Sequence, residues 1–124
     1  MQALVYFQSC SDPTRLRLLN LLREGPLCVC HFQTILQEPQ VKISKHLGYL
    51  RRQGLVTVRR SGNWMIYSLP ARRSTGLTAL LEALPVILAK EPQSRKDLNR
   101  LKKLDLSCSP VAAIKSGRTS SCSY

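Results

Sequence analysis

QVKISKHLGYLRRQG, the sequence of residues 40–54, has apolar residues at Ile43, Leu47 and Leu50, the i, i+4, i+7 spacing of one helical face. The opposite face is polar and basic, with the small residue Gly48 at its middle. Such a helix is buried on one side and offers a basic, hydrogen-bonding side that can approach a partner closely. The same pattern also fits an ordinary solvated surface helix, so the neighbouring sequence has to decide between the two.

The sequence before this stretch predicts a second short helix, over residues 28–36. Its apolar residues Phe32, Ile35 and Leu36 share one face, and residues 37–39 (QEP) form a turn. Two short helices joined by about three residues, the second basic on its outer side, are typical of a helix-turn-helix.

The sequence after Gly54 predicts a β-hairpin. LVTVRR (55–60) and WMIYSL (64–69) alternate apolar and polar residues across the turn-forming tip SGN (61–63). A hairpin directly after a helix-turn-helix indicates a winged helix, whose basic wing would lie along phosphates or in the minor groove. Arg59 and Arg60 beside the tip could instead be solvated charges that protect an edge strand.

The rest of the chain predicts further helices. A helix is expected over residues 14–23, with Ser11 or Asp12 as its cap and Pro13 in its first turn. Helices are also expected at 2–9, at 75–89 (kinked or ended near Pro85) and at 90–104. The fold class is therefore mainly α with a small β-hairpin (α+β), a winged helix-turn-helix. Residues 1–104 form its DNA-binding and dimerisation domain, with 75–89 as the dimer helix. Residues 105–124 are Ser-rich and expected to be a disordered tail.

The charge distribution favours a polyanionic partner, either nucleic acid or an anionic membrane surface. The net charge is +12, and no carboxylate lies between Glu38 and Glu82. The start of the chain does not have the pattern of a signal peptide, and no apolar run approaches the ~20 residues that cross a bilayer. The expected location is the cytoplasm. The five cysteines do not look like a disulfide framework, so Cys28-Val29-Cys30 indicates a thiol or metal site.

Residues 12–69 resemble the ArsR/SmtB family of bacterial winged-helix, metal-sensing repressors. The matching motifs, in the family's order and spacing, are DPTRLR (12–17), LCVC (27–30), Gln40 with SKHL (44–47), LR (50–51) with GLV (54–56), and RR (59–60) with Gly62 and Tyr67. Cys-Val-Cys at the head of the helix before the basic helix resembles the arsenite-responsive branch. The resemblance implies a homodimer that binds double-stranded, palindromic operator DNA and leaves it when As(III) or Sb(III) binds.

The resemblance also implies which residues contact DNA. Gln40, Ser44, Lys45 and His46 fall on the family's DNA-reading helix, and Arg59, Arg60 and Asn63 fall on its wing. Helical geometry adds that Val41 and Lys45 point most directly outward, flanked by Lys42, Tyr49 and Arg52. His46 lies at the boundary of the apolar face, where it either contacts DNA or fixes the helix onto its neighbours.

The expected metalloid ligands are the thiolates of Cys28 and Cys30, because As(III) and Sb(III) are soft. Within a regular helix these residues would point about 200° apart, so binding would distort the helix start. The family's third cysteine position is Gln33 here, and His31 follows Cys30. The ion is then held by two thiolates alone, or with a third ligand from Cys10, Cys108 or Cys122, with His31 a weaker candidate.

The alternatives belong to other functional classes. A thiol enzyme or metal-transfer protein acting through Cys28 and Cys30 would lack a histidine–carboxylate pair or phosphate loop. A ligand-independent architectural DNA binder would leave the two cysteines as structural thiols. The zinc site that related sensors carry on the dimer helix is not expected, because residues 75–89 include Glu82 but no histidine. We therefore expect a binding protein with no catalytic residues.

Overall fold

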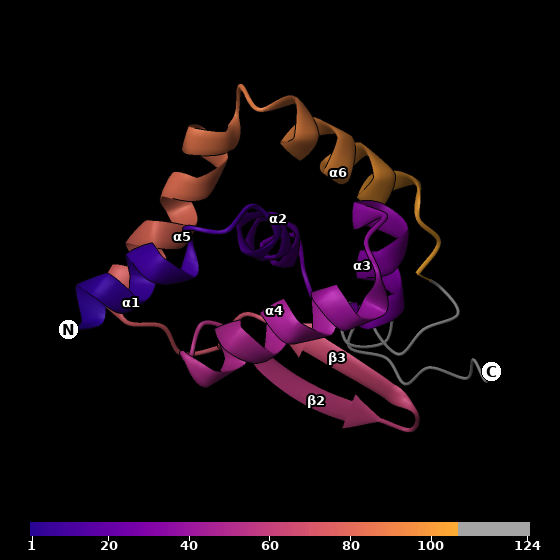
Figure 1. Ribbon diagram of the computed structural model, residues 1–124, viewed down its shortest axis with the longest axis horizontal. Coiled ribbons are helices and arrows are strands. Elements are labelled where there is room, and N and C mark those ends of the chain that lie inside the picture. The colour runs from indigo at the N-terminus through magenta and orange to yellow at the C-terminus, as the bar shows by residue number, and fades with distance from the viewer. Residues whose placement is uncertain (107–124) are drawn as a thin grey trace.

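A computed structural model describes residues 1–106 of the chain. Its elements, in chain order, are α1 (Gln2–Ser9), α2 (Pro13–Leu22), β1 (Leu27–Cys28), α3 (Val29–Leu36), α4 (Gln40–Arg52), β2 (Thr57–Ser61), β3 (Trp64–Ser68), α5 (Thr75–Leu88) and α6 (Pro92–Lys103). The hairpin of β2 and β3 lies at one edge of the molecule beside α4, and α6 lies at the opposite edge (Figure 1). The expected winged helix-turn-helix is confirmed.

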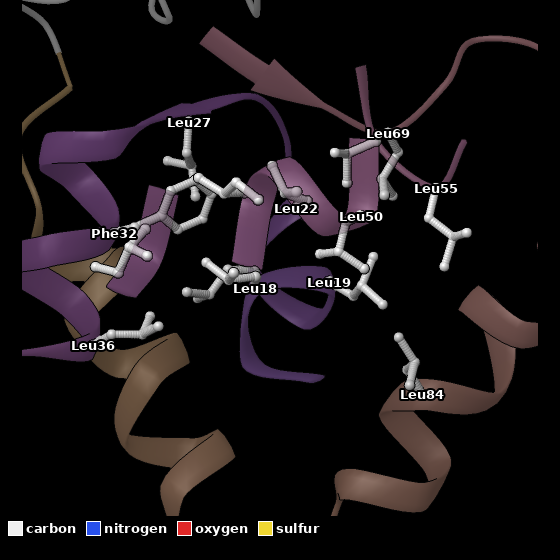
Figure 2. Packing of buried hydrophobic residues seen from close by; sticks show 14 of the residues in the cluster. Leu18, Leu19, Leu22, Leu27, Phe32, Leu36, Leu50, Leu55, Leu69 and Leu84 are labelled. Carbon is white, nitrogen blue, oxygen red and sulfur yellow. The ribbon is translucent and has the colours of Figure 1, made fainter. Parts of the chain in front are cut away.

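The hydrophobic core is built around α2 and α4. Ile43, Leu47 and Leu50 of α4 are fully buried, as their spacing predicted, and they belong to one cluster with Leu18 and Leu19 of α2. Figure 2 shows Leu18, Leu19 and Leu50 between the helices, with Leu84 of α5 approaching from one side. Burying one such leucine contributes roughly 1.5–3 kcal/mol, so this apolar stripe fixes the orientation of α4.

The helix starts follow from their caps. Asp12 is the N-cap of α2, and its Oδ2 accepts a hydrogen bond from the Arg15 backbone N–H at 3.1 Å. Ser74 caps α5 in the same way by accepting from Leu77. Pro85 lies inside α5 and does not end it, although the ring removes one backbone donor.

The sheet has three strands where the sequence predicted two. β1 pairs antiparallel with β3, Leu27 opposite Tyr67 and Cys28 opposite Ile66, and the strand order is β1-β3-β2. The helix predicted at 28–36 therefore begins one residue later, at Val29, and Cys28 is its extended N-cap with φ −92° and ψ 163°. A two-residue strand is too short to leave a periodic signal in the sequence, which is why it was missed.

Polar contacts hold α6 against α2 and α3. The Arg17 guanidinium donates to both carboxylate oxygens of Asp97, at 2.8 and 2.9 Å, and to the Leu36 carbonyl at 3.2 Å. Arg100 of α6 donates to the Ile35 carbonyl at 2.8 Å. Both arginines thus satisfy carbonyls at the C-terminal end of α3, where a helix leaves acceptors without intrahelical partners.

The predicted tail lies almost entirely outside the described residues. Across residues 1–106, none of the helices is both long enough and apolar enough to cross a lipid bilayer.

Candidate functional site

The outer face of α4 is exposed and basic. Val41 is 81% exposed, and Gln40, Lys42, Lys45, Arg51 and Arg52 are also exposed. Ser44 and Gly48 are partly buried. Lys42 forms an ion pair with Glu38 at 3.3 Å, one helical turn away. Such an exposed pair contributes little stability and leaves the lysine free to turn toward another anion.

His46 and Tyr49 face α2, where Arg15 engages both. The Arg15 Nη1 lies 3.3 Å from His46 Nδ1, and its guanidinium carbon lies 4.1 Å from the centre of the Tyr49 ring. His46 Nε2 is 3.7 Å from Asp12 Oδ2. This arrangement favours the interpretation that His46 fixes α4 onto α2. Sequence reasoning missed Arg15, although it stands inside the DPTRLR motif.

The environment of His46 lowers its pKa. Burial is the largest cause, and the nearby positive charges of Arg15, Lys45 and Lys42 act in the same direction, while Asp12 opposes them. The imidazole is therefore neutral at neutral pH, which suits Nδ1 as an acceptor for the Arg15 N–H.

The wing carries its two arginines on opposite faces. Arg59 and Arg60 are both exposed and adjacent in β2, and side chains alternate along a strand. Arg59 pairs with buried Ile66, whereas Arg60 pairs with exposed Met65 and donates to the Gly62 carbonyl at 3.0 Å. Gly62 has φ +61°, the left-handed conformation that favours glycine in a tight turn. Asn63 completes the tip and is exposed.

Cys28 and Cys30 line one pocket of about 310 Å³. Cys28 is buried and Cys30 is exposed. The pocket wall consists of Cys28, Val29, Cys30, Gln33, Gln40, Asn63, Trp64 and Met65. The geometry expected for two cysteines within one helix was wrong, because Cys28 precedes α3 in an extended conformation. One cavity thus brings the cysteine pair together with the first residue of α4 and the tip of the wing.

Both thiols are protonated at neutral pH. Burial, reinforced by the nearby Cys30, raises the pKa of Cys28 to about 12. Burial also raises the pKa of Cys30, opposed by the backbone N–H groups of His31 and of Cys30 itself. Neither sulfur is therefore an activated nucleophile of the kind that thiol enzymes use.

His31 stabilises the start of α3. Its Nδ1 accepts a hydrogen bond from the Cys28 backbone N–H at 3.0 Å, and its ring stacks on Trp64 with centroids 6.1 Å apart. The ring is buried. His31 Nδ1 is thus engaged in capping the helix, which makes the residue a poor metal ligand through that atom. The role of Trp64 was not foreseen from the sequence.

Cys10 lies in a different part of the fold. It lines a cavity of about 430 Å³ together with Arg17, Asp97 and Ile87, among others. Within residues 1–106, no three His, Cys, Asp or Glu side chains gather closely enough to hold a metal ion. Cys108 and Cys122, the other expected candidates, lie outside the described residues.

Comparison with known proteins agrees with the fold and the motifs. Residues 12–58 match the family described as bacterial regulatory protein, arsR family. The chain is 36% identical over 110 residues to the arsenic resistance transcriptional regulator ArsR1 of Pseudomonas putida, covering 87% of this chain and 84% of the relative. It is 47% identical over 64 residues to the arsenical resistance operon repressor of Escherichia coli, covering 51% and 55%. Among solved structures, HlyU from Vibrio cholerae superposes with a TM-score of 0.64 at 30% identity, covering 72% of this chain and 94% of that one.

Proposed function

Because the chain belongs to the arsR family of bacterial transcriptional regulators, we propose that it is a homodimeric repressor of an arsenic-resistance operon. In this proposal it binds double-stranded operator DNA through α4 and the wing. It leaves the operator when As(III) or Sb(III) binds Cys28 and Cys30. The observation that carries the proposal is the shared pocket, whose wall holds both thiols, Gln40 and Asn63.

The DNA contacts are assigned to the outer side of α4. Gln40 and Ser44, near the helix N-terminus, are suited to hydrogen-bond base edges, and Lys45 and Lys42 to pair with phosphates. Val41 can make apolar contact with a thymine methyl, and Arg52 lies further along the same side. His46 and Tyr49 support this face from behind through Arg15.

The wing supplies the second part of the DNA interface. Since Arg59 and Arg60 lie on opposite faces of the hairpin, we assign one to a phosphate on each side of the wing, with Asn63 at the tip between them. Contacts of this kind position a protein on the duplex without reading its sequence.

The metalloid step acts on the backbone that connects the sensor to the wing. In this proposal, drawing the buried Cys28 and the exposed Cys30 onto one arsenic moves the junction of β1 and α3. Cys28 pairs with Ile66 in β3 of the wing, and its backbone N–H donates to His31 of α3. The movement is therefore transmitted to the wing and, through α3, to α4, the two elements assigned to DNA binding. A hundredfold loss of operator affinity corresponds to a coupling free energy of about 2.7 kcal/mol.

The dimer interface is assigned to α1 and α5. Exposed large apolar side chains gather there: Leu4 (53%) and Phe7 (73%) on α1, and Val86 (77%) and Ile87 (64%) on α5. The two helices are joined by the hydrogen bond between Tyr6 and Ser74 at 2.8 Å. Apolar surface of this kind is typical of a subunit interface.

The test uses an operator fragment that the protein itself selects from a random-sequence duplex library. Fluorescence anisotropy should show binding that weakens steeply with salt, with a logarithmic slope of roughly −0.9 per neutralised phosphate. Arsenite should release the wild-type protein. It should release Cys28→Ser and Cys30→Ser variants at least tenfold less effectively.

Two other outcomes would contradict the proposal. If arsenite released the Cys28→Ser and Cys30→Ser variants as effectively as the wild type, the arsenite-binding site would lie outside this pocket. Tight operator binding that no soft metal ion alters would identify a ligand-independent architectural protein.

A further inference from the structure

The cavity that Cys10 lines, between α2, α5 and α6, is separate from the pocket of Cys28 and Cys30. Its volume is about 430 Å³, and among the described residues the two cavities have no wall residue in common. In Figure 1, α5 and α6 meet at an angle, and α2 lies on the inner side of that angle. Cavities of roughly 300–1,000 Å³ are the usual size of small-molecule sites, so the chemistry of this wall indicates what the cavity can hold.

Much of the wall is aliphatic. Leu16 of α2 and Leu88 of α5 are partly buried and pack on the main core. Ile87, which also lines the cavity, is 64% exposed and therefore lies on its solvent side. Side chains of this kind favour a ligand with an apolar body, because burying that body removes apolar surface from water.

Asn20 of α2 and Ser94 of α6 add a buried polar pair to the wall. They are only 3% and 8% exposed, and Asn20 Nδ2 donates to Ser94 Oγ at 3.0 Å. Within residues 1–106, Ser9 Oγ is the one side-chain oxygen or nitrogen that is both fully enclosed and unbonded. Asn20 Oδ1, which accepts no hydrogen bond from the described residues, is therefore still accessible. The Ser94 hydroxyl keeps its own proton to donate, so the pair offers a ligand one acceptor and one donor.

The charged groups of the wall exclude an anionic ligand. Asp97 is 1% exposed, and its carboxylate accepts hydrogen bonds from Arg17 at 2.8 and 2.9 Å and from Gln93 at 3.0 Å. Arg17 is the only basic side chain of the described wall, so an anion would find no free cation there. It would instead be repelled by Asp12 and Glu91, which line the same cavity.

From this wall we infer a binding site for an uncharged organic molecule with an apolar body and an amide-like edge, on which an N–H stands next to a carbonyl. The ligand N–H donates to Asn20 Oδ1, and its carbonyl accepts from the Ser94 hydroxyl. The site lies beside α4 as well, because Asp12 Oδ2 on its wall is 3.7 Å from His46 Nε2. This inference goes beyond the proposed function and does not depend on the metalloid site.

Benzamide is the probe, because its primary amide presents both groups on an apolar ring. Two-dimensional NMR titration of the full-length reduced protein at neutral pH should show saturable shifts that gather on α2, α5 and α6. Two compounds of the same shape serve as comparisons. Acetophenone lacks the N–H donor and should bind about tenfold more weakly, since Asn20 Oδ1 is left without a partner. Benzoate, an anion, should bind at least about tenfold more weakly.

Two variants each remove one partner of the ligand. Asn20→Leu removes the acceptor and Ser94→Ala removes the donor, and each should weaken benzamide binding about tenfold. Asn99→Leu makes the same exchange at an exposed position of α6 outside the cavity and should leave benzamide binding unchanged. If Asn20→Leu does not fold, Ser94→Ala, which removes a single oxygen atom, decides the comparison.

Three results would overturn the inference. The first is the absence of saturable benzamide binding to the wild type. The second is equal affinity for benzamide and acetophenone, or benzamide affinity that Ser94→Ala leaves unchanged, since either would indicate contact with an exposed apolar surface. The third is tighter binding of benzoate than of benzamide, which would identify an anion site. The release of DNA by arsenite is measured separately, so none of these results bears on the proposed function.

Discussion

Arg15 is the residue on which three elements converge. Its Nε donates to the Ser9 carbonyl at 2.9 Å and its Nη2 to the Gln8 carbonyl at 3.0 Å, both at the end of α1. The same guanidinium contacts His46 and Tyr49 of α4. A planar fork with five donors can satisfy these partners together, whereas an ammonium group cannot.

Replacing Arg15 with lysine should therefore lower the free energy of unfolding by about 1–2 kcal/mol, since at least one backbone carbonyl loses its donor and the contact with Tyr49 is weakened. Urea denaturation followed by circular dichroism measures the change. The control is Arg23→Lys at an exposed position. Equal stability of the two variants would contradict the role assigned to Arg15.

His46 should make stability depend on pH. Because its pKa is lowered in the folded state, the unfolded chain binds the proton first as the pH falls. The free energy of unfolding should thus be constant well above the ordinary histidine pKa of about 6.5 and decrease as the pH falls through that value toward the folded pKa. His46→Gln should flatten this decrease, as measured by denaturation between pH 7.5 and 5. A wild-type curve that rises on acidification over this interval would contradict the prediction.

At the scale of elements, the sequence predicted those helices and strands whose apolar residues recur with a helical or strand period. The buried stripe of α4 and the alternation across the hairpin placed both elements correctly. β1 was missed because a strand of two residues shows no periodic pattern. For the same reason the sequence did not predict that Cys28 lies outside α3. The partners of His46 were left undecided because they depend on how α2 crosses α4, which neither helix specifies alone.

The centre of α4 offers a test that separates folding from recognition. A Cβ added at Gly48 would meet only the flexible Arg52 side chain, at 3.4 Å. Gly48→Ala should raise the free energy of unfolding by roughly 0.5–1 kcal/mol, because glycine is disfavoured in a helix interior. The same change should weaken operator binding if the middle of α4 approaches the groove closely. Denaturation and anisotropy measure the two effects, and unchanged operator affinity would place this part of α4 away from DNA.

At the scale of the whole molecule, the basic surface and the exposed apolar surface lie on different elements. The basic side lies on α4 and the wing, and the exposed apolar side chains lie on α1 and α5. Two copies joined through α1 and α5 would present two basic helices to one duplex, as a palindromic operator requires.

Charges placed on the apolar side should dissociate the dimer. Phe7→Glu combined with Ile87→Glu would bury two carboxylates in the proposed interface, which we expect to shift the protein to monomer and to reduce operator affinity at least about a hundredfold. Sedimentation velocity and anisotropy measure these changes. Ala71→Glu, in the exposed loop before α5, is the control. A doubly substituted protein that remains dimeric would exclude this surface as the interface.

The pocket that Gln40 and Asn63 share with the two thiols has a consequence for how sensitively a cell would respond. Coupling between two sites is reciprocal. If arsenite releases the protein from its operator as proposed, the factor by which arsenite weakens operator binding is also the factor by which the operator weakens arsenite binding. Protein that sits on DNA is then the less sensitive detector, and unbound copies in the cell capture the first arsenite to enter. The arsenite concentration that triggers transcription would thus rise with the number of protein copies that are not bound to DNA. The expression level of the protein would then set the arsenite concentration at which transcription begins.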